Sequence, residues 1–144
     1  MTWKEIEKGF RRKFDKQVVE WRRQNKARIG VQIQPSALAD AVRFLMQKGQ
    51  ARFVTATSWE GLNGAIEIWY HFDFFQTPQL ISLGVSLRSG EYQVPSISPL
   101  VKNADWIERE ISELLGVVFI GHPNPGHLLL PKGWPKQSFP LRRD

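Results

Sequence analysis

The chain has 144 residues, which fits one domain with a real core, and 42% hydrophobic with 24% charged residues is typical of a globular protein. It has no cysteine, which excludes a disulfide framework, an iron–sulfur cluster held by its own thiolates, and a cysteine-ligated zinc or nickel site. The net charge of +6 and a pI near 9.9 leave three classes of partner open: nucleic acid, an anionic membrane surface and an acidic protein.

Basic residues are concentrated at the N-terminal end, where half of the 20 lie in the first 28 positions. This pattern predicts a solvated basic helix face or, as the alternative, a surface that docks on phosphate or on an acidic subunit. The opening residues have no apolar core, so they are not expected to act as a signal peptide. The longest nearly unbroken apolar run, residues 114–120, is far too short to cross a bilayer, so membrane attachment is expected to run through a partner.

The first element is predicted to be an amphipathic helix, with Thr2 as its N-cap and Glu5 completing a capping box. Its apolar stripe recurs at spacings of three and four: Trp3, Ile6, Phe10, Phe14 and Val18. Near Gln17 the pattern changes to alternation. Two strands are therefore predicted on either side of a hairpin turn at QNKA, residues 24–27.

A second helix is predicted to open at Pro35 and Ser36 and to end at Gly49, which would supply a left-handed cap. Its buried face would carry Leu38, Val42, Leu45 and Met46. Residues 52–57 are rich in β-formers, and after an EGLNG turn two strands are predicted at 65–74 and 80–87, joined at QTPQ.

A third helix is predicted with Asn103 or Asp105 as its cap and Gly116 as its terminator. It would bury Ile107, Ile111, Leu114 and Leu115, and residues 117–120 would form a last short strand. The segment 121–144 then holds five of the nine prolines, so it cannot form a helix or a central strand. We therefore expect one α+β domain over residues 1–120, with a mostly antiparallel sheet flanked by helices. Residues 121–144 are expected to form an extended docking tail along a partner's surface.

Few side chains offer catalytic chemistry. His71 lies inside the aromatic run WYHFDFF and is expected to be structural. His122 and His127 are five apart on non-helical backbone, without the acidic or cysteine cluster that a metal site needs, so they are expected to fix a turn. A hydrolase built on Glu110 and His122 stays open as an alternative.

The densest charged group lies on the third predicted helix. Arg109 and Glu113 are spaced for an i,i+4 pair, and the other members of this group are Glu108 and Glu110. These charges are expected to pair with a partner or with Arg142 and Arg143. An RNA-binding alternative rests on basic charge with strand aromatics such as Trp59 and Trp69, but no RNP-type motif or zinc-finger spacing supports it, so no nucleic acid is expected.

An ordered series of motifs covers the last third of the chain: Val94-Pro95-Ser96, Ala104, Trp106, Glu108-Arg109-Glu110, Glu113, Gly116, Phe119, Gly121-His122-Pro123, Leu130-Pro131, Trp134 and Pro140-Leu141-Arg142-Arg143-Asp144. This series closely resembles the signature of the thirty-kilodalton subunit family of respiratory complex I, known as the C-type subunits of NADH:quinone oxidoreductase. The earlier part of the chain agrees only in element order and in the strand IEIWYHF.

Departures from that signature point to one branch of the family. Ser112-Glu113 stands where the family has Tyr-Asp, and residues 124–127, Asn-Pro-Gly-His, replace a Leu-Arg-Arg stretch. Many complex I members also carry a longer tail. The shorter form resembles the homologue in energy-converting, group 4 nickel–iron hydrogenases, with complex I proper as the alternative.

The resemblance implies a structural, non-catalytic subunit that holds no metal or cofactor. It would pack on a hydrogenase-type or complex I-type large subunit beside the small iron–sulfur subunit. The nickel–iron centre and iron–sulfur clusters would lie in those partners. The complex would couple ferredoxin- or NADH-linked electron transfer to ion translocation, with this chain peripheral at the cytoplasmic face of the membrane. The expected partner interface comprises Trp106, Glu108, Arg109, Glu110, Glu113, His122, Pro123, Leu130, Pro131, Trp134, Leu141, Arg142 and Arg143.

Overall fold

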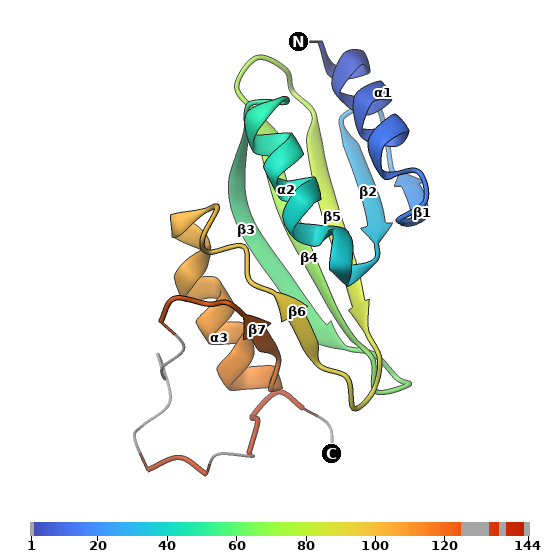
Figure 1. Ribbon diagram of the computed structural model, residues 1–144. Helices are drawn as coiled ribbons and strands as arrows, with labels where there is room; N and C mark the ends of the chain where they lie inside the picture. Colours follow the sequence, from blue (N-terminus) through green and yellow to red (C-terminus); the bar gives the residue numbers. More distant parts are fainter. Residues whose placement is uncertain (1, 125–132, 136–137, 143–144) are drawn as a thin grey trace.

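The computed structural model of the chain describes residues 2–124, 133–135 and 138–142. Figure 1 shows its elements in chain order. They are α1 (Trp3–Phe14), β1 (Val18–Arg23), β2 (Arg28–Ile33), the 3-10 turn η1 (Pro35–Ala37), α2 (Leu38–Gln47), β3 (Ala51–Glu60), β4 (Ile66–Phe74), β5 (Leu80–Leu87), β6 (Gln93–Pro95), the 3-10 turn η2 (Lys102–Ala104), α3 (Asp105–Leu115) and β7 (Val118–Ile120).

The main sheet has five strands in the order β1-β2-β5-β4-β3. Every neighbouring pair is antiparallel except β2 and β5, which run parallel with Val31 opposite Leu83. A second sheet of two short parallel strands joins β6 to β7, with Val94 opposite Phe119. The expected α+β class with a mostly antiparallel sheet is confirmed.

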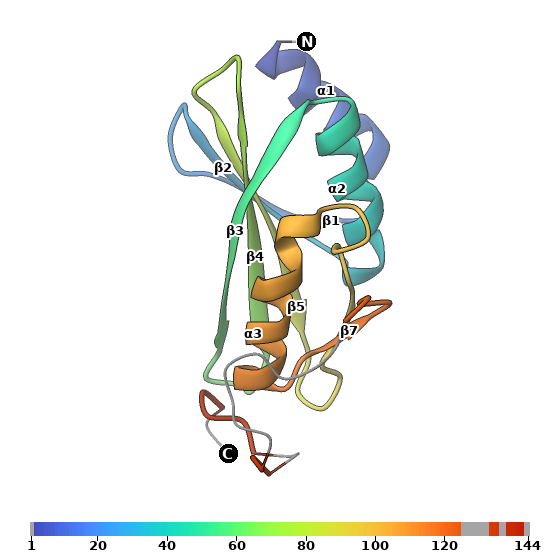
Figure 2. The ribbon, with the colours of Figure 1, turned by 90° about the vertical axis from the view of Figure 1, so that its left-hand side faces the viewer.

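All three helices lie on one face of the main sheet, as the two views in Figures 1 and 2 show. The alternation along β4 follows from this arrangement. Ile66, Ile68 and Tyr70 point to the helices and are fully buried, whereas Glu67 and His71 point to the other face and are half-buried. That second face is left uncovered by the helices.

α1 forms as its sequence predicts. The Thr2 hydroxyl accepts the backbone N–H of Glu5 at 3.3 Å, and the Glu5 carboxylate accepts the N–H of Thr2 at 2.9 Å, so both halves of the capping box are present. Ile6, Phe10 and Phe14 are buried against the sheet. The last member of the predicted stripe, Val18, instead begins β1.

The end of α2 differs from the expectation. Pro35 and Ser36 form the 3-10 turn that leads into the helix, and the left-handed residue after the helix is Gln50, with a φ of 53°, not Gly49. Gly49 is required for packing instead. A Cβ there would lie 2.9 Å from the Leu45 carbonyl oxygen and 3.1 Å from the Phe74 ring.

The start of α3 also differs from the expectation. Ala104 occupies the N-cap position without a side-chain cap, and Asp105 is already the first helical residue. The Asn103 side chain donates instead to the Phe53 carbonyl oxygen of β3 at 3.3 Å. Gly116 ends the helix in the left-handed conformation, with a φ of 79°, as predicted. Among the described residues, no helix is long and apolar enough to cross a membrane.

Candidate partner interface

A buried carboxylate organises the region that carries the signature motifs. Glu108, in the first turn of α3, is 0% exposed. Its carboxylate accepts hydrogen bonds from the Ser96 hydroxyl at 2.6 Å, from the Ile97 backbone N–H at 2.9 Å and from the Ser98 hydroxyl. These three donors satisfy the buried charge and tie the segment after β6 to α3.

His122 closes the other side of this cluster. Its Nδ1 accepts the backbone N–H of Asn124 at 2.9 Å, so the ring proton lies on Nε2. Nε2 is 3.2 Å from the Asp105 carbonyl oxygen and 3.8 Å from a Glu108 carboxylate oxygen. The motifs Val94-Pro95-Ser96, Glu108-Arg109-Glu110 and Gly121-His122-Pro123 therefore meet at one point. We refer to Ser96, Ile97, Ser98, Glu108 and His122 as the Glu108 cluster.

The core lies directly beneath the cluster. Burial raises the pKa of the Tyr70 hydroxyl well above its usual range, and the nearby Glu108 carboxylate raises it further. That hydroxyl has no hydrogen-bond partner among the described residues. Tyr70 is therefore held neutral at physiological pH and contributes packing rather than proton transfer.

The geometry does not bring Glu110 and His122 together. Glu110 follows Glu108 by two residues, which turns its side chain roughly 200° around the helix and away from His122. The His122 ring is committed to Asn124 and Asp105. In the ranges that the structure describes, no group of three or more His, Asp or Glu side chains could hold a metal ion.

Two members of the predicted interface, Glu108 and Glu113, are buried within the chain. Their side chains do not reach the surface that the chain exposes, and the partner interface itself stays a prediction. A carboxylate on a helix ordinarily faces solvent. The pattern of the helix alone does not reveal the hydrogen-bond donors that allow Glu108 to be buried. The pair of hydroxyls in Ser96-Ile97-Ser98 is the sequence signal that could have revealed them.

Other members of the predicted interface are accessible. Trp106 is 68% exposed, Pro123 is exposed, and Arg109 and Glu110 are half-buried. The predicted interface does not include Val118 and Ile120, whose apolar side chains are 54% and 56% exposed on the outer side of β7.

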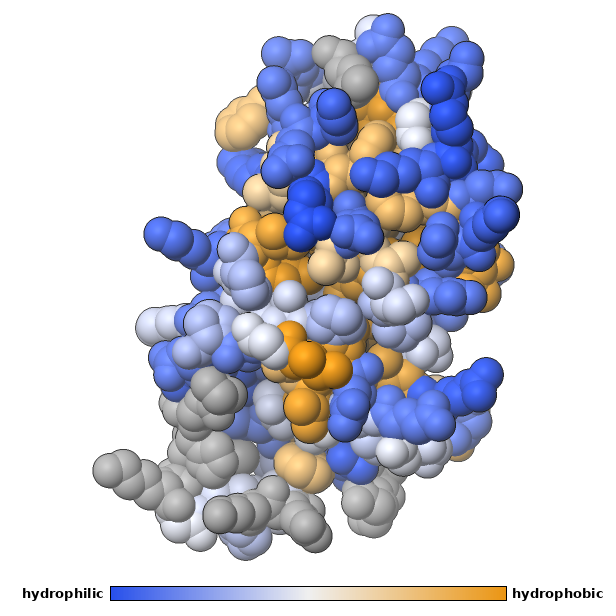
Figure 3. Space-filling model, viewed as in Figure 1, coloured by the Kyte–Doolittle hydropathy of each residue, from blue (hydrophilic) through white to orange (hydrophobic). Residues whose placement is uncertain are grey.

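The apolar atoms over β7 are visible in Figure 3. The contact of His122 with Asp105 brings the end of β7 beside the first turn of α3. We call Trp106, Val118, Ile120 and Pro123 the β7 face.

The described part of the tail packs on this chain. The Arg142 guanidinium donates to the Leu115 carbonyl oxygen at 2.9 Å and lies 4.3 Å from the Tyr92 ring centroid. A cation at this end of α3 also complements the helix dipole. The Leu141 backbone N–H donates to the Leu114 carbonyl oxygen, while the Leu141 side chain is exposed. Trp134 is half-buried and donates to the Ser138 carbonyl oxygen. The remaining predicted positions, Leu130, Pro131 and Arg143, lie outside the described residues, as does His127.

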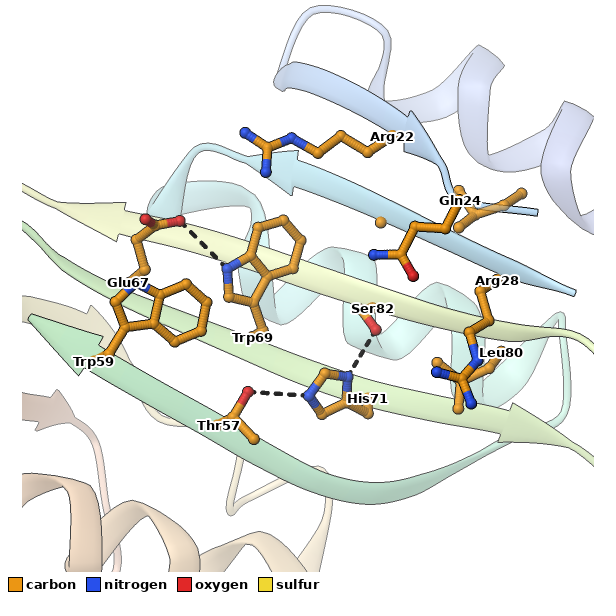
Figure 4. A pocket seen from close by; sticks show the side chains of 12 residues that line it. Arg22, Gln24, Arg28, Thr57, Trp59, Glu67, Trp69, His71, Leu80 and Ser82 are labelled. Carbon is orange, nitrogen blue, oxygen red and sulfur yellow. Dashed lines mark hydrogen bonds between the residues drawn. The ribbon is translucent and has the colours of Figure 1, made fainter. Parts of the chain in front are cut away.

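The uncovered face of the main sheet carries a second candidate site, a hollow of about 430 Å³ shown in Figure 4. Trp69 lies across its floor above Gly84, where a Cβ would come within 2.6 Å of the indole ring. Glu67 accepts the indole N–H at 3.3 Å. Arg22 and Arg28 stand at the margin, on the opposite side from Trp59.

His71, on β4, lines this hollow and contacts side chains of both neighbouring strands, β3 and β5. Its Nδ1 lies 2.7 Å from the Ser82 hydroxyl and its Nε2 lies 3.1 Å from the Thr57 hydroxyl. Burial lowers the pKa of His71, which favours the neutral ring. Ser82 and His71 have the spacing of a nucleophile and its base, but no carboxylate of the described ranges hydrogen-bonds to the ring. The backbone of β5 is paired on both sides, so it offers no oxyanion donors to Ser82. Through these hydrogen bonds His71 links β4 to β3 and β5, and its structural role stays a prediction.

Comparison with known proteins identifies a family. Residues 31–144 match the profile of the family described as respiratory-chain NADH dehydrogenase, 30 Kd subunit. The C-type subunit of NADH-quinone oxidoreductase from Ruegeria pomeroyi is 34% identical over 121 residues, covering 81% of this chain and 59% of that protein. The J-type subunit of NAD(P)H-quinone oxidoreductase from Prochlorococcus marinus is 36% identical over 122 residues, covering 79% of this chain and 68% of that protein.

A third relative is the C/D-type subunit of NADH-quinone oxidoreductase from Photorhabdus laumondii. It is 40% identical over 89 residues, which make up 61% of this chain and 14% of that protein. The chain thus spans less than two thirds of the length of the Ruegeria and Photorhabdus proteins. The match over residues 94–144 confirms the resemblance found in the sequence.

Solved structures share the fold. A chain in the structure of the membrane-bound sulfane sulfur reductase, an archaeal respiratory membrane complex, matches with a TM-score of 0.73 at 17% identity, covering 91% of this chain and 75% of that one. A trypsin-resistant fragment of Nqo5 matches with a TM-score of 0.67 at 15% identity, covering 86% of this chain and 99% of that one.

Proposed function

The chain belongs to the family of the 30-kDa subunit of respiratory-chain NADH dehydrogenase, and from this premise we propose that it is a structural subunit of a complex I-like, membrane-bound oxidoreductase. It holds no cofactor in this proposal and performs no catalytic step itself. Its role is to pack on the large catalytic subunit and to keep that subunit in the assembly. The membrane is reached through partners, with this chain peripheral at the cytoplasmic face.

The observation that carries the choice of partner is the relative of C/D type. Its name indicates that a C-type region and a D-type region are joined covalently in one chain. A permanent link of this kind supports contact between the two regions where they are separate chains. We therefore infer that the partner of this chain is a D-type large subunit.

The β7 face is the surface we assign to this contact. Trp106, Val118 and Ile120 expose large apolar side chains on a part of the fold that the Glu108 cluster holds in place. Exposed apolar groups on a rigid element, with a tryptophan among them, are typical of the anchors of protein interfaces. The cluster would then position the interface from beneath without touching the partner.

Mutation of the β7 face tests this assignment. The full chain carrying Ile120→Asp is expressed with its native neighbours, and the amount of large subunit that co-purifies is measured. We expect it to fall at least tenfold, because a buried carboxylate without a partner opposes association. Leu62→Asp is the matched control, since Leu62 is 97% exposed in the turn between β3 and β4. Equal recovery of the large subunit with both variants would reject the β7 face as the contact.

The finer assignment is the energy-converting nickel–iron hydrogenase branch, with the small iron–sulfur subunit as a further neighbour. It rests on Ser112-Glu113 and on residues 124–127, which depart from the complex I signature. The alternative, a subunit of NADH:quinone oxidoreductase, is favoured by the names of the curated relatives. In the hydrogenase branch, electrons from a donor such as ferredoxin would reach a nickel–iron centre in the large subunit.

Metal analysis of the purified native complex separates the two branches. Nickel in stoichiometric amount, with a large subunit that carries two Cys-x-x-Cys pairs, supports the hydrogenase branch. A complex that lacks nickel and reduces a quinone with NADH assigns the chain to the other branch. Neither result depends on the β7 face.

A further inference from the structure

The net positive charge of the chain comes from one segment. Residues 1–28 contain ten basic and four acidic residues, a net charge of +6, which is the net charge of the whole protein. The remaining 116 residues contain ten of each sign and are neutral in sum. In the described part of this segment, residues 2–28, lie α1, β1, the turn after β1 and the first residue of β2. We call this part of the molecule the basic edge.

Four cations of the basic edge form one stripe. Lys4, Lys8, Arg12 and Lys16 follow one another at a spacing of four, so they lie close together along α1 and its C-terminal end. All four side chains are exposed. Within the described part of the chain, no carboxylate lies within ion-pair distance of any of them. Like charges at this spacing repel by a few tenths of a kcal/mol per pair, roughly, so the pairing of these charges does not stabilise the isolated helix.

Neighbouring cations of the basic edge, in contrast to the stripe, form contacts within this chain. Arg11 and Arg23 both pair with Glu7, at 3.3 and 2.6 Å. The Arg11 guanidinium also lies 3.8 Å from the Trp21 ring centroid. These contacts join α1 to β1. The stripe makes no comparable contact, and its charge is left available to a partner.

The basic edge and the β7 face lie at opposite sides of the molecule. β1 and β3 are the two edge strands of the main sheet, and α3 packs on β3 whereas Phe10 of α1 packs on Trp21 of β1. Figure 1 shows α1 and β1 at the opposite edge of the sheet from α3 and β7. A partner can therefore be seated on the β7 face without covering the stripe.

We propose that the basic edge is a second docking surface, which binds an acidic surface of another protein subunit. The proposal rests on the proposed function in one respect, that the chain works within an assembly of several subunits. The stripe spans about 18 Å along α1, enough to face a row of carboxylates on a flat surface or a helix. Charge complementarity of this kind sets the association rate and the orientation of a partner.

The side chains around the stripe favour protein over RNA or lipid. Proteins that bind single-stranded RNA commonly stack its bases on exposed aromatic rings, but here Phe10 and Phe14 are buried and Trp21 is covered by Arg11. Insertion into a lipid surface needs an exposed apolar helix face, and the apolar face of α1 is buried in the core of this chain. An acidic protein surface needs neither.

Zero-length crosslinking of the purified native complex tests the proposal. A carbodiimide joins a lysine amine directly to a carboxylate in contact with it, and mass spectrometry then identifies both residues. We expect Lys4, Lys8 and Lys16 to be linked to aspartates or glutamates of a subunit other than the D-type one. Lys102, exposed at the start of η2, is the control position where no such link is expected.

A charge-reversal variant tests whether the stripe is needed to retain the crosslinked subunit. Lys8→Glu with Arg12→Glu is expected to lower retention of the crosslinked subunit at least tenfold, and to leave retention of the D-type subunit unchanged. Arg88→Glu with Lys102→Glu changes the net charge equally at exposed positions outside the basic edge and should retain every subunit. Unfolding temperature is measured for both variants, and the stripe variant should match or exceed the wild type because it turns two of the three like-charge pairs of the stripe into opposite-charge pairs.

Several results would overturn the proposal. One is the absence of intermolecular links from the stripe, and another is equal retention with both double variants. A third is that the wild-type complex binds single-stranded RNA or vesicles of anionic phosphatidylserine, and that the stripe variant loses this binding while it retains all subunits. Failure of the proposed function has a different signature, because the D-type subunit would then be missing from the wild-type preparation itself.

Discussion

Tyr70 shows what a single unsatisfied group contributes. Its hydroxyl is buried without a hydrogen-bond partner among the described residues, close to the negative charge of Glu108. Tyr70→Phe removes the hydroxyl and keeps the ring. We expect the free energy of unfolding in urea to stay the same or to rise by up to about 1 kcal/mol, because an unpaired buried hydroxyl is unfavourable. A loss of more than about 1 kcal/mol would show that the hydroxyl has a partner in solution.

His71 makes stability depend on pH. Burial lowers its pKa in the folded state below the ordinary value of 6.5. The unfolded chain therefore binds a proton more readily, so stability is fully present above about pH 6.5 and declines as the pH falls below it. We expect the wild type to lose more stability between pH 7.5 and pH 5.5 than His71→Gln does. Chemical denaturation at both pH values measures this difference, and identical losses would assign the pH dependence to other groups.

At the scale of the element, the Glu108 cluster replaces a conventional helix cap. α3 begins at Asp105 with no side chain capping its N-terminus, yet the Glu108 carboxylate fixes its first turns to Ser96, Ile97 and Ser98. A helix of 11 residues is marginal by itself and depends on such tertiary contacts. The cluster therefore determines where α3 and β7 sit.

Removing that carboxylate is expected to be costly. Glu108→Ala leaves two buried hydroxyls and one backbone N–H without an acceptor, and we expect a loss of roughly 3–5 kcal/mol in the free energy of unfolding. Glu110→Ala, on another face of the same helix, is the control and should change stability by less than about 1 kcal/mol. Urea unfolding of the full chain gives both values. Similar effects of the two substitutions would mean that the hydrogen bonds of Glu108 contribute little.

Local signals made some elements predictable. The capping box of α1 and the glycine that ends α3 depend on neighbouring residues alone, and both were predicted correctly. The parallel pairing of β2 with β5 and the burial of Glu108 depend on residues far apart in the chain. Gly49 shows the same limit, because its need for a bare Cα comes partly from Phe74 and not from its own φ. The site was therefore located by its motifs, while the division into buried and exposed members needed the fold.

At the scale of the whole molecule, the tail and the domain are not independent. Arg142 and Leu141 contact the last residues of α3, so the segment described at 138–142 stabilises the domain as well as any partner that it touches. A deletion of residues 128–144 is therefore a poor test of docking alone. Point substitutions on the two exposed surfaces separate assembly from folding more cleanly.

The two surfaces are expected to act independently, because they lie near opposite edges of the main sheet and share no residue. A chain that combines Ile120→Asp with Lys8→Glu and Arg12→Glu should lose both neighbours, each to the extent seen with the separate variants. Distant substitutions usually add within about 0.5 kcal/mol, which corresponds to a factor of roughly two in affinity. Retention of each subunit, quantified by mass spectrometry of the purified complex, measures this. A combined loss far larger than the sum of the separate effects would show that the two partners also contact each other, and that this chain strengthens an interface between them.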